Sequence, residues 1–332
     1  MPMKRSFLAA LAIPIAAALA VGGLVFALRP SALLHPSTVL HSPAVPSPAV
    51  PSPSAAGRSI ATCIDRNVPN PFVGVAINPP IALASRSFGD ATRSRLSVIE
   101  FYSGFPRQFP RYEAAQAAGR GALPMIQLNP RNVSLARIAA GGYDSYLRTY
   151  AAAVRDFRCR VALSFGHEMN GSWYSWGLPG TRPATFIAAW RHIYRLFQAE
   201  HARNVIWSWD PDHVWKPNRG SSWARTWWPG ASYVDWIGID GYLRPGQTFA
   251  SMFGHQLARI RTFSAKPVFI AETGVQPGAG QASQIAGLFA AVRRYHLAGL
   301  IWFDVNRLEN WRLEGDPSGL AAFHEAAAGI GA

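Results

Sequence analysis

The sequence predicts an α/β protein, a (β/α)8 TIM barrel that follows an N-terminal apolar segment and a Pro-rich linker. Short apolar runs bounded by turn residues alternate with stretches of helical periodicity, a pattern typical of repeated βα units. The chain has 332 residues. The roughly 270 residues that follow the linker suit one α/β barrel. Eight such units indicate a closed barrel rather than an open doubly wound sheet.

Each expected strand is a short run rich in aliphatic or aromatic residues. The eight runs are Phe72–Asn78, Val98–Ser103, Pro124–Asn129, Val161–Gly166, Val205–Trp209, Trp236–Asp240, Pro267–Ala271 and Leu300–Asp304. Apolar residues at helical spacing predict helices between them, among them Tyr143–Phe157, Pro183–Ala199 and Ala282–Tyr295. The chain therefore alternates strand and helix along most of its length.

The first 58 residues are expected to lie outside the barrel, which we place at residues 59–332. In residues 1–28, Lys4 and Arg5 precede an uncharged run that is long enough to cross a bilayer. This segment is either a cleaved signal peptide or an uncleaved membrane anchor. Residues 29–58 are rich in Pro, Ser and Ala and contain no acidic residue, which predicts a disordered, extended linker.

The chain is strongly basic, with a formal net charge of +14 from 32 Lys and Arg against 18 Asp and Glu. Nearly all of these cations are Arg, and they are scattered along the sequence without a basic run. Nucleic acid is therefore not an expected partner, because phosphate backbones are followed by clustered cations. A general affinity for acidic surfaces stays open.

Cys63 and Cys159 are the two cysteines of the chain. Export would permit a disulfide bond between them. Two buried free thiols are the alternative, since the sequence does not show whether the two Cα atoms approach each other. Neither cysteine belongs to a metal-binding pattern.

Most of the expected strands end in polar or aromatic residues. In a barrel of this kind the C-terminal ends of the strands meet at one mouth, which carries the active site. An acidic and aromatic mouth suits a neutral sugar held by hydrogen bonds and ring stacking. No Gly-rich phosphate loop supports a nucleotide or phosphosugar. The residues concerned are Asn129, His167, Glu168, Asp210, Asp240, Tyr242, Glu272, Asp304 and Asn306.

Two glutamates in this pattern follow strands that lie nearly across the expected barrel from each other. Glu168 follows the fourth expected strand and Glu272 the seventh, so both carboxyls are expected to face one cleft. Charged groups at the end of an apolar strand are costly to bury unless they have partners or a function. Hydrolysis of a glycosidic bond needs such a pair, one protonated and one ionised, about 5–5.5 Å apart in retaining enzymes.

Three motifs in order are similar to those of glycoside hydrolase family 26, whose best-known members are β-mannanases. Residues 167–177 (His-Glu-Met-Asn-Gly-x-Trp-Tyr-x-Trp-Gly) resemble the acid/base signature of the family. Residues 236–242 resemble its sixth strand, and residues 266–274 resemble its nucleophile strand. The resemblance extends over most of residues 70–320.

The resemblance implies a retaining double displacement, with Glu168 as general acid/base and Glu272 as nucleophile. It also implies that Tyr242 donates a hydrogen bond to the nucleophile and that His167 lies against the sugar. The remaining substrate contacts it implies are Trp173, which would line the subsites around the scissile bond, and Trp302, which would form the stacking floor.

Some of these residues have other interpretations. His167 and Glu168 match half of an HExxH zinc motif, but Gly171 stands where the second histidine is required. Neither a metal nor a cofactor is therefore predicted. Asp240 is either a substrate contact or a buried carboxylate that orients its neighbours.

The expected function is endo-acting hydrolysis of a β-linked polysaccharide, with β-1,4-mannan first. β-1,3-xylan and mixed-linkage β-glucan are substrates of the same family and stay open. A noncatalytic glycan-binding barrel that serves envelope polysaccharide assembly is the competing class. We expect a monomer, either secreted or anchored to the outer face of the cytoplasmic membrane by its N-terminal segment.

Overall fold

The computed structural model describes residues 68–330, apart from 215–222 and 308. The predicted signal or anchor at 1–28, the predicted linker at 29–58, and Cys63 lie outside the described residues. Cys159 is buried. Within the described part of the chain, none of the helices has the length and hydrophobicity that a bilayer crossing requires.

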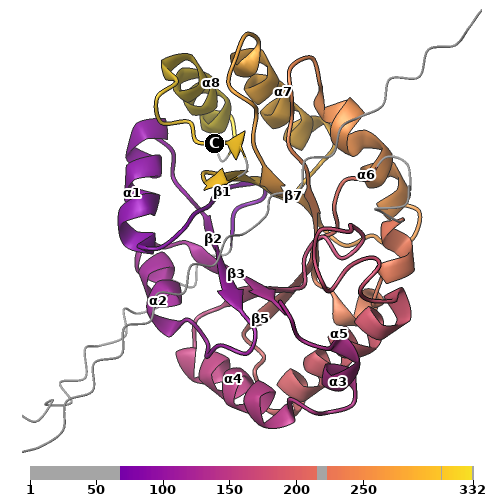
Figure 1. Cartoon of the computed structure of the whole chain (residues 1–332). Coiled ribbons are helices and arrows are strands. Elements are labelled where there is room, and N and C mark those ends of the chain that lie inside the picture. Colours follow the sequence, from indigo (N-terminus) through magenta and orange to yellow (C-terminus); the bar gives the residue numbers. More distant parts are fainter. Residues whose placement is uncertain (1–67, 215–222, 308, 331–332) are drawn as a thin grey trace, which may run out of the picture. The chain divides into compact units, whose positions relative to one another are not determined.

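Eight parallel strands form a closed barrel in the order β1 to β8, with β8 pairing back to β1 (Figure 1). This confirms the predicted (β/α)8 barrel, and the predicted bounds differ from the observed ones by only a few residues. The strands are β1 Phe72–Ala76, β2 Val98–Gly104, β3 Leu123–Asn129, β4 Val161–Phe165, β5 Val205–Trp209, β6 Trp236–Asp240, β7 Val268–Thr273 and β8 Gly299–Phe303.

Helices surround the barrel on its outer side (Figure 1). They are α1 Ile81–Thr92, α2 Arg111–Gly119, α3 Leu135–Ala139, α4 Asp144–Phe157, α5 Pro183–Ala199, α6 His255–Ile260, α7 Gln281–Arg294 and α8 Pro317–Ala328. Between β5 and β6 the described residues form the short 3-10 helices η1 Ala224–Trp227 and η2 Ala231–Tyr233. A π-helical turn, η3 Ala250–Gly254, leads into α6, and a small hairpin of β9 Asn306–Arg307 and β10 Glu309–Asn310 follows β8.

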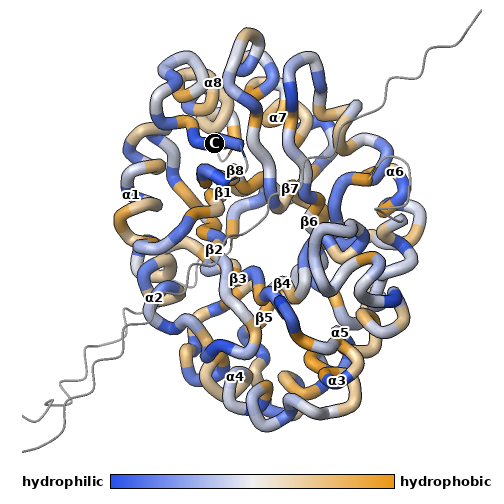
Figure 2. The backbone as a smooth tube through the Cα atoms, in the orientation of Figure 1, coloured by the Kyte–Doolittle hydropathy of each residue, from blue (hydrophilic) through white to orange (hydrophobic). Residues whose placement is uncertain are grey.

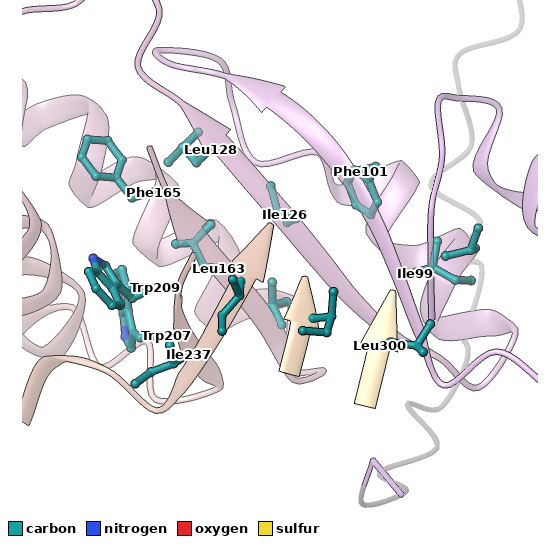
Figure 3. Packing of buried hydrophobic residues seen from close by; sticks show 14 of the residues in the cluster. Ile99, Phe101, Ile126, Leu128, Leu163, Phe165, Trp207, Trp209, Ile237 and Leu300 are labelled. Carbon is teal, nitrogen blue, oxygen red and sulfur yellow. The ribbon is translucent and has the colours of Figure 1, made fainter. Parts of the chain in front are cut away.

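The alternation of side chains along the strands separates two cores. Outward-pointing residues such as Phe101, Phe165 and Trp207 pack between the strands and the helices (Figure 3). Figure 2 shows hydrophobic and hydrophilic residues alternating along these helices, as expected when one helix face covers a sheet. Inward-pointing residues such as Met125 and Phe269 fill the barrel interior. The polar inward residues near the strand C-termini form the candidate site.

Candidate active site

Backbone geometry places Glu168 at the mouth of the barrel. After β4, Gly166 and Glu168 both adopt left-handed conformations, with φ of +62° and +51°. The Glu168 N–H donates to the Asp210 carbonyl oxygen at 2.7 Å, which ties this turn to the end of β5. A left-handed non-glycine residue is uncommon and often marks a functional turn. The turn holds a glutamate that is only 8% exposed at the mouth.

Glu272 lies in β7 and receives one hydrogen bond on each carboxylate oxygen. The Tyr102 hydroxyl donates to Oε1 at 2.5 Å, and the Tyr242 hydroxyl donates to Oε2 at 2.6 Å. Burial raises the pKa of Glu272, whereas these two hydrogen bonds and the positive charge of Arg307 lower it. The structure therefore surrounds this buried carboxyl with groups that favour its ionised form.

Glu168 has the opposite surroundings. Burial raises its pKa well above the usual range, and the negative charges of Asp212 and Glu272 raise it further. The indole N–H of Trp173 donates to Glu168 Oε2 and, with the more weakly acting Arg307, opposes this rise. The pKa of Glu272 is also raised, but its two tyrosine hydrogen bonds favour the ionised form, whereas neighbouring negative charges oppose ionisation of Glu168. This asymmetry matches the different roles of an acid and a nucleophile.

His167 lies close to both glutamates. It precedes Glu168 in the chain, and its Nε2 lies 3.8 Å from Glu272 Oε1. Burial, together with Arg307 and Arg131, lowers its pKa to about 3, so the ring is neutral at ordinary pH. Nδ1 contacts Asn129 Oδ1 at 3.0 Å, which assigns the ring proton to Nδ1 and leaves Nε2 as an acceptor at the site.

Asp240 lies beside the nucleophile, because a register shift between Ile239 and Asp240 pairs it with Glu272. Its side chain is fully buried, and neither carboxyl oxygen has a hydrogen-bond partner among the described residues. Burial raises its pKa well above the usual range, followed by the charges of Glu272 and Glu168. Full burial favours the interpretation of Asp240 as a buried carboxyl over a direct sugar contact.

A second layer of polar side chains lies within the barrel beneath Glu272. Gln127 Nε2 donates to Asp210 Oδ2 at 3.0 Å and to Glu100 Oε2 at 3.3 Å. Glu100 Oε1 also lies 3.3 Å from the Tyr102 hydroxyl. The Tyr102 hydroxyl has a single proton, which it donates to Glu272 in the shorter of its two contacts. The contact with Glu100 is therefore a hydrogen bond when Glu100 is protonated and donates to the Tyr102 oxygen. Burial and the charge of Glu272 raise the pKa of Glu100 well above its usual range, which agrees with a neutral group.

The two predicted tryptophans occupy different environments. Trp173 is 51% exposed at the mouth and is free to meet a sugar ring. Trp302 does not lie in the site, and its predicted role as the stacking floor is corrected. Leu300 and Trp302 of β8 point outward, whereas Ile301 and Phe303 point into the barrel.

Helix α8 covers the indole of Trp302. Trp302 packs edge-on against Phe323 with ring centroids 5.6 Å apart, and its N–H donates to the Trp311 carbonyl oxygen at 3.0 Å. Trp311 takes the place near the site instead, since its ring lies 4.7 Å from that of Tyr242. The irregular segment after β8 places Trp311 beside Tyr242. Helix and strand periodicity in the sequence does not predict the path of such a segment.

Tyr102 and Glu100 are site residues that the sequence analysis missed. A signal was present, because Glu100 and Tyr102 occupy alternate positions in an otherwise apolar strand and therefore share its inner face. In the described part of the chain, no group of His, Cys, Asp and Glu is arranged to hold a metal ion. The carboxyls and hydroxyls at the mouth contact each other rather than a common centre.

Comparisons with known proteins identify relatives of this chain. Endoglucanase H of Acetivibrio thermocellus is 28% identical over 266 residues, covering 74% of this chain and 29% of that protein. Mannan endo-1,4-beta-mannosidase A and B of Caldalkalibacillus mannanilyticus is 32% identical over 105 residues, covering 30% of this chain and 19% of that protein. The chain thus spans less than a third of the length of these curated relatives.

The fold also has solved counterparts. An endo-beta-1,4-mannanase double mutant of Cellulomonas fimi superposes with a TM-score of 0.61 at 17% identity, over 78% of this chain and 71% of that one. The family model for glycosyl hydrolase family 26 matches residues 145–310, a segment that includes both Glu168 and Glu272. The chain therefore belongs to glycosyl hydrolase family 26.

Proposed function

We propose that this chain is a retaining glycoside hydrolase that cleaves a β-linked polysaccharide at internal bonds, with β-1,4-mannan as its substrate. The observation that carries the proposal is the asymmetry between two buried carboxyls at one barrel mouth. Glu272 receives hydrogen bonds from two tyrosines, whereas Glu168 receives one and faces the negative charge of Asp212. The first is suited to attack as a carboxylate, and the second to donate a proton.

The reaction has two steps. In the first, Glu272 attacks the anomeric carbon and forms an ester, while Glu168 gives its proton to the leaving glycosidic oxygen. In the second, the ionised Glu168 takes a proton from water, whose oxygen attacks the anomeric carbon and releases Glu272 as a carboxylate. Both displacements invert the anomeric centre, so the product retains the β-configuration.

Mannan is favoured because relatives of this chain include proteins named as mannan endo-1,4-beta-mannosidases. Another relative is named an endoglucanase and another a β-1,3-xylanase, so glucan and xylan belong in the same substrate screen. Trp173, exposed beside Glu168, supplies an aromatic face suited to any of these sugars. Release of oligosaccharides from mannan but not from β-1,3-xylan or mixed-linkage glucan would establish the choice.

The experiment replaces each glutamate by glutamine and measures reducing ends released from mannan. Glu168→Gln and Glu272→Gln are expected to lose nearly all activity while still binding mannan. Glu113→Gln, a carboxyl in the first turn of α2 on the outer side of the barrel, is the matched control and keeps full activity. Proton NMR of the first product formed by the wild type distinguishes retention from inversion. A wild type that binds glycans but cleaves none of them would instead make the chain a noncatalytic glycan-binding barrel.

We also propose that the chain is exported as a monomer and acts outside the cytoplasmic membrane, either secreted or anchored through residues 1–28. The uncharged run that follows Lys4 and Arg5 and the Pro-rich stretch after it support this proposal. Export would also favour a bond between Cys63 and Cys159. Cell fractionation with mass spectrometry of the mature N-terminus separates a cleaved signal from an anchor, and size-exclusion chromatography with light scattering tests the monomer.

A further inference from the structure

The end of the barrel opposite the mouth is built from the segments that precede each strand. Because all eight strands are parallel, these segments meet at one end. Backbone hydrogen bonds join neighbouring segments there: Leu123 N–H to Ser97 O at 2.9 Å, Val161 N–H to Asn204 O at 2.9 Å, and Ala298 N–H to Val268 O at 2.7 Å. They therefore form one continuous surface rather than separate loops.

This surface carries a concentration of exposed arginines. The segment before β2 contributes two, the segment before β3 one, the segment before β4 two and the segment before β5 one. We call them the basic face: Arg93, Arg95, Arg120, Arg158, Arg160 and Arg203. They follow one another around the barrel because β2, β3, β4 and β5 are consecutive neighbours.

The basic face carries an excess of positive charge. None of its six arginines forms an ion pair with another residue in the described ranges. The acids near this face are also engaged. Asp156, at the end of α4, forms an ion pair with Arg155 at 2.9 Å and also lies within the field of Arg158. Glu200 pairs with Arg148 at 2.7 Å, and Asp235 Oδ2 accepts from the backbone N–H of Trp207 at 2.9 Å. Arginines held without partners create a positive field that attracts an anionic surface.

The connectivity of the chain indicates which kind of anionic surface the basic face meets. Strand β1 begins at Phe72, so the preceding chain joins the barrel at the end that carries the basic face. That chain contains the uncharged run from Ser6 to Leu28, which is long enough to cross a bilayer. The mouth, with Glu168 and Glu272, lies at the other end of the same strands. A lipid surface is therefore favoured over a soluble anionic polymer, because the covalent attachment and the positive charge share one end.

We propose that the basic face docks on the phosphate headgroups of an anionic membrane and turns the mouth of the barrel away from the bilayer. Arginine binds phosphate oxygens through its fork of N–H donors, and several arginines near a charged membrane add their attraction. A barrel docked in this way presents its acidic mouth to polysaccharide on the far side from the membrane. The inference concerns a surface distinct from the active site and does not depend on which glycan is cleaved.

The test uses the full-length chain with vesicles of phosphatidylcholine alone or mixed with phosphatidylglycerol, both with a dansyl-labelled headgroup lipid. Energy transfer from the protein's tryptophans to the dansyl groups reports how close the barrel lies to the bilayer, whether or not the N-terminal segment inserts. The wild type is expected to show greater transfer on the anionic vesicles at low salt. At about 1 M salt, where charges are screened beyond about 3 Å, transfer is expected to fall to the level on neutral vesicles.

Two triple variants separate the basic face from general charge. Arg95→Gln, Arg120→Gln and Arg160→Gln together are expected to weaken docking on anionic vesicles by at least about tenfold.

The matched control carries the same change of charge at exposed arginines elsewhere, Arg86→Gln, Arg107→Gln and Arg182→Gln, and keeps the wild-type difference between vesicles. Equal transfer on both vesicles by the wild type at low salt, or an equal loss in the two variants, would overturn the proposal. So would binding to polygalacturonate through the basic face without any preference for anionic vesicles, since the partner would then be an acidic polymer.

Discussion

Replacing Tyr102 by Phe removes one oxygen from the site and leaves the ring in place. The Tyr102 hydroxyl donates to Glu272 Oε1 at 2.5 Å, and its effect in lowering the pKa of Glu272 ranks ahead of that of Tyr242. Without this donor the buried carboxylate is less well stabilised, so the pKa of Glu272 rises. A nucleophile with a raised pKa becomes protonated at higher pH, and the acidic limb of the kcat/KM profile moves to higher pH.

The size of the effect follows from the kind of hydrogen bond. A hydrogen bond to a charged group is worth about 1.5–3 kcal/mol. On the acidic limb kcat/KM is proportional to the ionised fraction of Glu272, so losing that free energy lowers kcat/KM roughly 10- to 150-fold there. The deficit shrinks at higher pH, where Glu272 is ionised in both forms.

The assay is kcat/KM for mannan oligosaccharides measured across the pH range for wild type, Tyr102→Phe and Tyr146→Phe. Tyr146→Phe is the matched control, because its hydroxyl donates to the Arg107 carbonyl oxygen at 2.7 Å, away from the nucleophile. The control is expected to keep the wild-type profile. An unmoved acidic limb in Tyr102→Phe, or a loss of activity that is the same at every pH, would refute the reasoning.

Two substitutions and one peptide map test other parts of the structure. Trp173→Phe removes the N–H donor to Glu168, so the pKa of Glu168 rises and the alkaline limb of kcat/KM moves to higher pH; a shift to lower pH would contradict this. Trp302→Phe is expected to lower the free energy of unfolding in urea by about 2 kcal/mol. KM should hardly change, since Trp302 is packed beneath a helix. A large rise in KM at unchanged stability would show instead that Trp302 contacts the sugar. Peptide mapping without reductant is expected to recover Cys63 and Cys159 in one linked species, and alkylation of both before reduction would exclude the bond.

The sequence by itself determined the fold and the two glutamates. Alternating strand and helix periodicity is a local property, and the predicted runs at Val205–Trp209 and Trp236–Asp240 coincide with the observed strands. A parallel barrel brings every strand C-terminus to one mouth, so locating Glu168 and Glu272 at strand ends was enough to place them there together. Tyr242 was placed beside the nucleophile by the family resemblance, and the structure gives that hydrogen bond.

Tertiary structure alone decided the surroundings that give the two carboxyls different tendencies to ionise. Tyr102 reaches Glu272 from a strand 170 positions away in the chain, and Glu100 lies beneath it only because the barrel closes. Trp302 was assigned to the wrong side of β8, since a large aromatic in a barrel strand suits either face and the packing of α8 selects the outer one. Burial, charge and hydrogen-bond partners depend on contacts between distant segments, which periodicity and motif spacing do not contain.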